Sequence, residues 1–261
     1  MPFRTDDGRP LDELLLAQRP ADGYRFEVRA GFVYDDPVSG RRYRVTARRP
    51  GAPLPDPDVA EPPVRGVTDL ASVPMWMWSF IASYGRQSAP AILHDERSID
   101  ADELGDREAA LAQRREDDRV FRTGLREQHV PVLRSWLMWA WVAADRERQF
   151  GGAAGVLLLV QVIVGAVLML GASVAAFWNP WWLVVLPIVA AAALPWGRLA
   201  PLVLVLTGSL VVLGPLLAVH LAALAVFRLV EALGEVLAGG DPRDVLRPTA
   251  LPPESPAPDA G

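Results

Sequence analysis

The sequence contains no cysteine, no lysine and only three histidines among its 261 residues. The lack of cysteine excludes disulfide scaffolds, thiolate zinc sites and cysteine nucleophiles. Since lysine is absent, all 26 basic residues are arginines, a bias that together with the abundant alanine and proline is typical of a GC-rich genome. The formal net charge of −5 excludes a basic nucleic-acid-binding protein, so we expect no nucleic acid among the partners.

Charge is almost absent from residues 151–227, where Arg198 is the only charged side chain. A helix needs about 20 apolar residues to cross the ~30 Å hydrocarbon core of a bilayer. The stretch therefore predicts a transmembrane region over residues 151–228, with three spans at about 151–178, 181–196 and 199–227. Because the second span is short and contains Pro187, two spans with a re-entrant segment are the alternative.

The aromatic and basic residues near this region predict its orientation. The turn at residues 178–182 holds three tryptophans, which are typical of a membrane interface. Arginines precede the first span and Arg198 follows the second, which places residues 1–150 and Arg198 in the cytoplasm and the tryptophan-rich turn outside. No apolar run in residues 1–150 is long enough for a signal peptide, which also favours a cytoplasmic location. The tail at 229–261 is rich in proline and aspartate and is expected to be disordered.

The soluble part, residues 24–150, follows an N-terminal segment at 1–23 and has an α+β pattern. Alternation near 24–28, and strands at 31–34 and 42–47 joined by a turn, predict a small sheet or hairpin. After a proline-rich loop and a short strand at 64–67, the apolar period becomes that of a helix. Helices are expected over residues 74–81, 88–98, 107–128 and 131–148. The last one carries three tryptophans just before the first span and is expected to lie along the membrane surface.

Several motifs in this part follow one another in a specific order. They are Thr68-Asp-Leu-Ala-Ser-Val-Pro74 with Trp76 and Trp78, Tyr84-Gly-Arg86, Ala89-Pro-Ala-Ile-Leu-His-Asp95, Glu116-Asp-Asp-Arg-Val-Phe121 and Trp136-Leu-Met138. Over about residues 64–148 they resemble the phage- and bacterium-associated domain-of-unknown-function family 1353. The resemblance implies the fold but no activity; together with the apolar stretch at 151–228, we expect a multi-pass protein of the bacterial plasma membrane. Ser98 stands where the family commonly has tyrosine.

One histidine and three aspartates are the candidate catalytic and metal-binding residues. His94 and Asp95 are adjacent on one expected helix, and Asp118 lies on the next. If the two helices run antiparallel, the carboxylate of Asp118 reaches the imidazole of His94, fixes its tautomer and makes it a better general base toward water. Asp95, together with Asp69 upstream, would then hold a hard divalent cation, calcium or magnesium.

This arrangement resembles the phospholipase A₂ superfamily, which implies a metal-assisted hydrolase acting on lipid esters. Three features depart from that pattern: no glycine-rich calcium loop precedes His94, no cysteines brace the helices, and Ser98 replaces the expected tyrosine. Separately, the acidic run at 95–106 lacks the spacing of an EF-hand loop. The alternative is a non-catalytic interaction or scaffold module of prophage origin, tethered to the lipid bilayer. In that interpretation His94 and Asp118 only lock two helices together, and Asp69 caps a turn.

Overall fold

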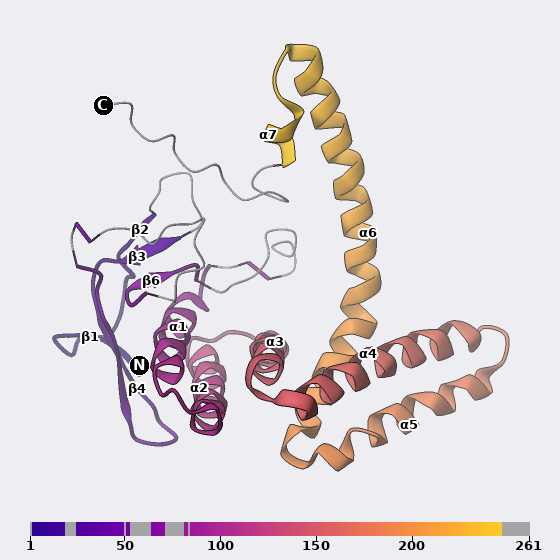
Figure 1. Cartoon of the computed structure of the whole chain (residues 1–261), viewed down its shortest axis with the longest axis horizontal. Helices are drawn as coiled ribbons and strands as arrows, with labels where there is room; N and C mark the ends of the chain where they lie inside the picture. The colour runs from indigo at the N-terminus through magenta and orange to yellow at the C-terminus, as the bar shows by residue number, and fades with distance from the viewer. Residues whose placement is uncertain are drawn as a thin grey trace. The chain divides into compact units, whose positions relative to one another are not determined.

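The structure, a computed structural model, describes residues 2–18, 25–49, 51–52, 64–70, 81–82 and 84–246 (Figure 1). The chain forms two compact units: residues 1–99 with 220–261, and residues 100–219. Small sheets come first along the chain and helices follow, which confirms the α+β class predicted from the sequence.

Two antiparallel three-stranded sheets lie in the first unit. One has the order β1-β4-β5, with β1 at Phe3–Thr5, β4 at Phe32–Asp35 and β5 at Arg42–Val45. The other has the order β2-β3-β6, with β2 at Leu16–Gln18, β3 at Phe26–Val28 and β6 at Val67–Thr68. The predicted β4–β5 hairpin is confirmed, whereas the strand expected at 64–67 is shifted toward Thr68.

The N-terminal segment differs from expectation, because it supplies β1 and β2 instead of preceding the domain. The ring of Phe3 packs against Phe32 and Tyr34, with centroids 6.1 and 4.5 Å apart, and all three side chains are buried. A strand of three residues has too little alternation to be recognised from sequence. Its stability comes from burying Phe3 against a strand almost thirty residues away.

The first unit also contains most of α1 (Ser88–Asp102), which begins where a helix was predicted and continues past the expected end at residue 98. Glycine at position 66 is required by its surroundings: its φ is +74°, and a Cβ there would lie 2.8 Å from the backbone nitrogen of Arg48. The aromatic helix expected over 74–81 lies outside the described residues, apart from residue 81.

In the second unit, α2 (Arg107–Glu127) and α3 (Val132–Phe150) confirm the two longest helices predicted for the soluble part. Asp106 caps the start of α2, and its carboxylate accepts a hydrogen bond from the amide of Ala109 at 2.9 Å. His129 adopts a left-handed conformation (φ 57°) in the turn that connects the two helices. The connection is short, so α2 and α3 pack together as a hairpin.

The apolar region contains two helices long and apolar enough to cross a membrane, Gly152–Ala175 and Leu194–Ala238. The first is α4 (Gly152–Ala175), and the second comprises η3 (Leu194–Leu199) and α6 (Ala200–Ala238). Between them, the expected middle span is divided into η2 (Pro180–Val184) and α5 (Val185–Ala191), which run back beside α4 (Figure 1). The structure thus has two long helices, where three continuous spans were expected. Prolines in the middle segment remove backbone donors, and Gly197 interrupts the helix with φ 55°.

The tail also differs from expectation. The helix α6 continues without a break to Ala238, and α7 (Pro242–Leu246) follows, so residues 229–238 are helical where disorder was expected. Arg228 and Glu231 form an ion pair of 2.7 Å one turn apart, and apolar residues continue the helical pattern. The proline-rich composition begins only after Gly239.

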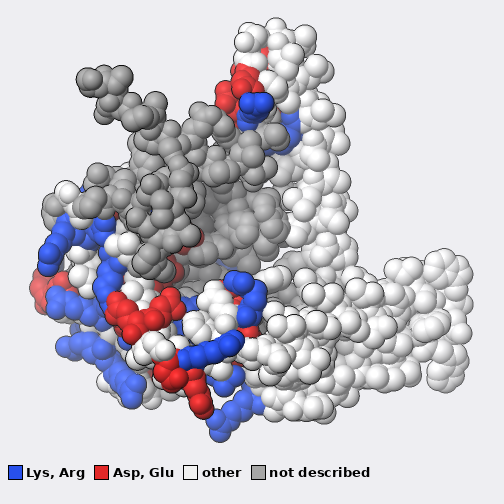
Figure 2. Space-filling view, viewed as in Figure 1, with Lys and Arg blue, Asp and Glu red and all other residues white. Residues whose placement is uncertain are grey.

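An apolar core joins three helices of the second unit. Its buried members from α3 are all alanines, whereas α4 and α6 contribute mostly larger residues: the cluster comprises Ala140, Ala143, Ala144, Leu158, Val162, Ala193, Ala200, Leu202, Val203 and Leu206. Many other apolar side chains of α4 and α6 are exposed, and only 28% of the most apolar stretch of each helix is buried. Figure 2 shows no charged side chain on the visible surface of α4 and α5.

Candidate functional site

The first group of candidate residues lies on α1, beside β6. Asp95 accepts a hydrogen bond from the hydroxyl of Thr68 across 2.6 Å. The same hydroxyl oxygen accepts a hydrogen bond from the amide of Leu70 at 2.8 Å, and Leu70 has a positive φ of 67°. Thr68 therefore links the carboxylate of Asp95 to the strained backbone beside Asp69, the other predicted metal ligand.

The next residue, Glu96, was not among the candidates from the sequence but is more deeply buried. Its carboxylate accepts a hydrogen bond from the amide of Gly66 at 3.3 Å and forms an ion pair with Arg65 at 3.5 Å. Arg97 then stacks over the ring of Tyr43 at 5.0 Å from its centroid. Residues 95–97 each contact the strand region, so this acidic turn of α1 attaches the helix to the sheets.

His94 is 8% exposed and lies within the same helix. Its carbonyl oxygen accepts a hydrogen bond from the hydroxyl of Ser98 at 2.8 Å. Among the described residues, no group of three or more histidine, aspartate and glutamate side chains is arranged to hold a metal ion. A cation site built from Asp95 and Asp69 would need further ligands from backbone carbonyls or water.

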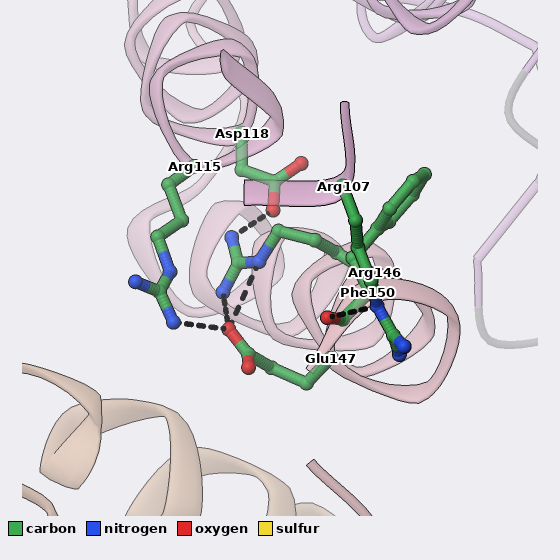
Figure 3. A network of polar contacts seen from close by, with 6 residues as sticks. All are labelled: Arg107, Arg115, Asp118, Arg146, Glu147 and Phe150. Atoms are coloured by element: carbon green, nitrogen blue, oxygen red, sulfur yellow. Dashed lines mark hydrogen bonds and ion pairs between the residues drawn. The ribbon is translucent and has the colours of Figure 1, made fainter. Parts of the chain in front are cut away.

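The fourth predicted residue, Asp118, lies on α2 in the second unit and is completely buried. Its carboxylate is paired with Arg146 of α3, which is also buried (Figure 3). Arg146 in turn donates to the carboxylate of the adjacent Glu147, at 2.9 and 3.1 Å. Figure 3 shows the guanidinium of Arg146 between the two carboxylates.

A second arginine reaches the same network from α2. Arg115 lies 3.3 Å from Glu147 and is half-exposed, whereas Glu147 is buried. The network of Asp118, Arg146, Glu147 and Arg115 therefore contains two cations and two anions, which balance inside the α2–α3 hairpin. Breaking a buried pair by removing one partner costs about 3–5 kcal/mol, because the remaining charge is left without compensation.

The same carboxyl-bearing residue, Glu147, lies at the corner between α3 and α4. A Cβ at Gly155 would lie 2.0 Å from the carbonyl oxygen of Glu147, and one at Gly151 would lie 2.5 Å from it. Gly152, between them, has φ +59°. Only glycine permits so close an approach of the start of α4 to the last turns of α3.

The predicted contact between His94 and Asp118 stays a prediction. The two residues belong to different units, and Arg146 is one partner of Asp118. Arg146 and Glu147 were not among the site residues expected from the sequence. A signal was present: Ala140, Ala143 and Glu147 follow the i, i+3, i+7 spacing of one buried helix face, so the face that begins with alanines ends in a charge.

Residues 58–142 match the family model described as "Protein of unknown function (DUF1353)". The match includes the motifs on which the resemblance to that family was based. It covers α1, α2 and the first half of α3 and ends before Arg146. No curated protein and no solved structure matches the chain.

Proposed function

We propose that this protein is a membrane-anchored, non-catalytic interaction module whose α2–α3 hairpin packs against its first membrane helix. The observation that carries the proposal is the pairing of buried Asp118 with Arg146. Asp118 is the carboxylate that a His94 general base needs, and here it binds an arginine of α3. That pairing favours a structural role for the aspartate.

The anchor consists of the two long apolar helices. With 24 residues, α4 is about 36 Å long, which matches the ~30 Å hydrocarbon core. Its far end carries exposed aromatic residues, with Phe177, Trp178 and Trp181 at least 80% exposed, as expected for a membrane interface. The core helix of a soluble protein would bury most of its apolar side chains, and α4 leaves most of them exposed.

We extend the proposal to a third, discontinuous crossing between α4 and α6. The amide of Gln161 in α4 donates to the carbonyl oxygen of Ala192 at 2.7 Å and accepts from the indole of Trp196 at 2.8 Å. These bonds satisfy polar groups where the middle segment is broken, which is the condition for a broken helix in lipid. In this topology residues 1–150 and Arg198 lie in the cytoplasm of a bacterial cell, and the turn at 178–182 lies outside.

The experiment that tests the topology uses the absence of native cysteine. Asn179→Cys and Ser39→Cys, each as the single cysteine of the full chain, are labelled in intact cells with a membrane-impermeant maleimide. Asn179→Cys is expected to react in intact cells and Ser39→Cys only after permeabilisation. The reverse pattern would overturn the orientation. Loss of both variants from the membrane fraction in alkaline carbonate would overturn the anchor.

The second candidate function is hydrolysis of lipid esters, favoured by the buried histidine on an acidic helix turn. In it, His94 acts as the base, Asp118 orients the imidazole, and Asp95 with Asp69 holds calcium or magnesium. The carboxylate of Asp118 has a second oxygen besides the one that binds Arg146, and His94 would use that oxygen. A membrane anchor would keep such an enzyme at its substrate.

Measurements of activity and of metal binding together distinguish this candidate function from the first. The full chain is reconstituted in phospholipid vesicles, and fatty-acid release is measured with calcium, magnesium or chelator. The hydrolase requires release that His94→Gln abolishes, and a Tm that rises with the metal unless Asp95→Asn is present, because a ligand stabilises the state that binds it. The interaction module predicts that no fatty acid is released and that neither calcium nor magnesium changes the Tm.

A further inference from the structure

One face of α3 is apolar, exposed and close to the membrane helices. Leu133, Leu137 and Trp141 follow one another at intervals of four residues and lie on one side of the helix; we name them the Leu133 stripe. Leu133 is 71% exposed and Trp141 is 43% exposed, and Leu137 between them is partly buried. Exposed apolar residues in a continuous row on a helix indicate a binding surface.

The position of α3 relative to α4 limits what this surface contacts. Ala140 lies ten residues before Phe150, about 15 Å along α3, and Leu158 lies about 9 Å along α4. If α3 continued straight out of the membrane, the two residues would be about 24 Å apart along the helix axes. They share one core instead, so the chain folds sharply at Gly151–Gly155 and α3 lies against the end of α4.

The Leu133 stripe borders the face of α3 that enters this core. Trp141 follows Ala140 directly and precedes Ala144 by less than one turn, and both alanines pack among the membrane helices. In the proposed anchor, the stripe therefore lies at the depth where α4 enters the bilayer. Tryptophan and leucine are the residues that interfacial helices place at the boundary between headgroups and acyl chains.

The charge near the start of the Leu133 stripe indicates what kind of ligand this surface binds. Arg134 is exposed, and it makes no ion pair or hydrogen bond with another described residue. At the other end of α3, Arg148 is paired with Asp145 at 2.7 Å and is 64% exposed. The face thus has one unpaired cation beside an apolar row, which complements an anionic headgroup above acyl chains.

We propose that α3 is an interfacial helix that binds anionic phospholipids, with the Leu133 stripe at the headgroup–acyl boundary and Arg134 on a lipid phosphate. This inference rests on the proposed membrane anchor and adds to it a lipid-binding surface outside the spanning helices. The surface belongs to the family-matching segment, since residues 133–141 fall within the matched range. The matched domain is then itself a membrane-contacting domain.

The position of the stripe is tested with spin labels on the full chain in vesicles containing phosphatidylglycerol and phosphatidylcholine. Leu133→Cys and Trp141→Cys carry single labels, and Val38→Cys, an exposed apolar residue of the β4–β5 turn, is the matched control. The first two labels are expected to be relaxed by lipid-soluble oxygen and shielded from an aqueous nickel complex, and the control is expected to show the opposite. Labels at 133 and 141 that are as accessible to nickel as the control would overturn the proposal. Labels shielded from both reagents would assign the stripe to a protein partner and would overturn it as well.

The phosphate contact is tested by lipid selectivity. The immobilised fraction of spin-labelled phosphatidylglycerol, relative to spin-labelled phosphatidylcholine, is measured for Arg134→Gln, Arg134→Lys and the exposed control Arg9→Gln. Arg134→Gln is expected to reduce the preference for phosphatidylglycerol about fivefold, with the other two unchanged. An unchanged preference in Arg134→Gln would overturn the phosphate contact. Failure of the chain to float with the vesicles would overturn the anchor itself, which distinguishes the two proposals.

Discussion

Arg107, the first residue of α2, donates its Nε–H to the carbonyl oxygen of Phe150, the last residue of α3, across 3.0 Å. Its Nη2 also reaches the carbonyl of Gln149 at 3.3 Å. A cation at the carboxyl end of a helix interacts favourably with the helix dipole and satisfies carbonyls that have no partner within the helix. The start of α2, the end of α3 and the start of α4 therefore meet at one point, where the soluble helices pass into the apolar region.

The ion-pair network makes Asp118 important for stability. Asp118→Asn is expected to reduce the free energy of unfolding by about 3 kcal/mol, because Arg146 stays buried with one carboxylate fewer. The measurement is thermal or denaturant unfolding of the detergent-solubilised full chain. Asp145→Asn, which removes an exposed pair on α3 next to Arg146, is the control and is expected to change stability by less than about 0.5 kcal/mol. Equal effects of the two variants would contradict the buried network.

The corner between α3 and α4 depends on Gly155. Gly155→Ala is expected to destabilise the protein by about 1–3 kcal/mol, since the new methyl group overlaps the carbonyl of Glu147. Gly171→Ala is the matched control: it lies on the same helix, has nothing within 4 Å of its Cβ position, and should be neutral or slightly stabilising. The Tm of each variant checks this. A destabilised Gly171→Ala with a normal Gly155→Ala would show that the corner is open.

Gln161 holds the broken middle segment against α4. Gln161→Leu leaves the indole of Trp196 and the carbonyl of Ala192 without this partner, and is expected to cost about 1–2 kcal/mol. The fluorescence of Trp196, as the only tryptophan in a chain with the others replaced by phenylalanine, should also shift when its hydrogen bond is lost. Gln149→Leu, at an exposed glutamine that binds Asp145, is expected to have little effect. An unshifted spectrum would argue against the proposed crossing.

His94 distinguishes a structural from a catalytic histidine. In the interaction module, His94→Gln is expected to destabilise the protein by about 1–3 kcal/mol, because a buried imidazole is replaced by a group that satisfies its surroundings less well. His129→Asn is the control, since that residue is exposed and asparagine tolerates its left-handed conformation. Unfolding curves provide the measurement. Unchanged stability of His94→Gln, together with loss of a hydrolysis that the unmodified protein shows, would favour the enzyme.

The sequence predicted the α2–α3 hairpin because long apolar periodicity is a local signal, present within each helix. It did not predict β1 and β2, because three-residue strands depend on partners far along the chain. For Asp118 it predicted a histidine partner, which stays a prediction, and it did not predict the pairing with Arg146. His94 lies 24 positions before it and Arg146 lies 28 positions after it, so spacing alone does not rank them. The pairing of Asp118 with Arg146 depends on how α3 packs. The packing of α3 follows from its alanine face and from the glycines at its end.

The length of α6 has a consequence for the far side of the membrane. Its uncharged part ends at Phe227, and Arg228–Ala238 adds eleven residues, or about 16 Å of helix. In the proposed topology this helical extension projects beyond the lipid, with Arg228 and Glu231 at the end nearest the membrane. A periplasmic or extracellular structure that bound at Ala238 would be held at a distance from the bilayer surface by this extension. Deleting whole turns of the extension would shorten that distance in steps of about 5.4 Å.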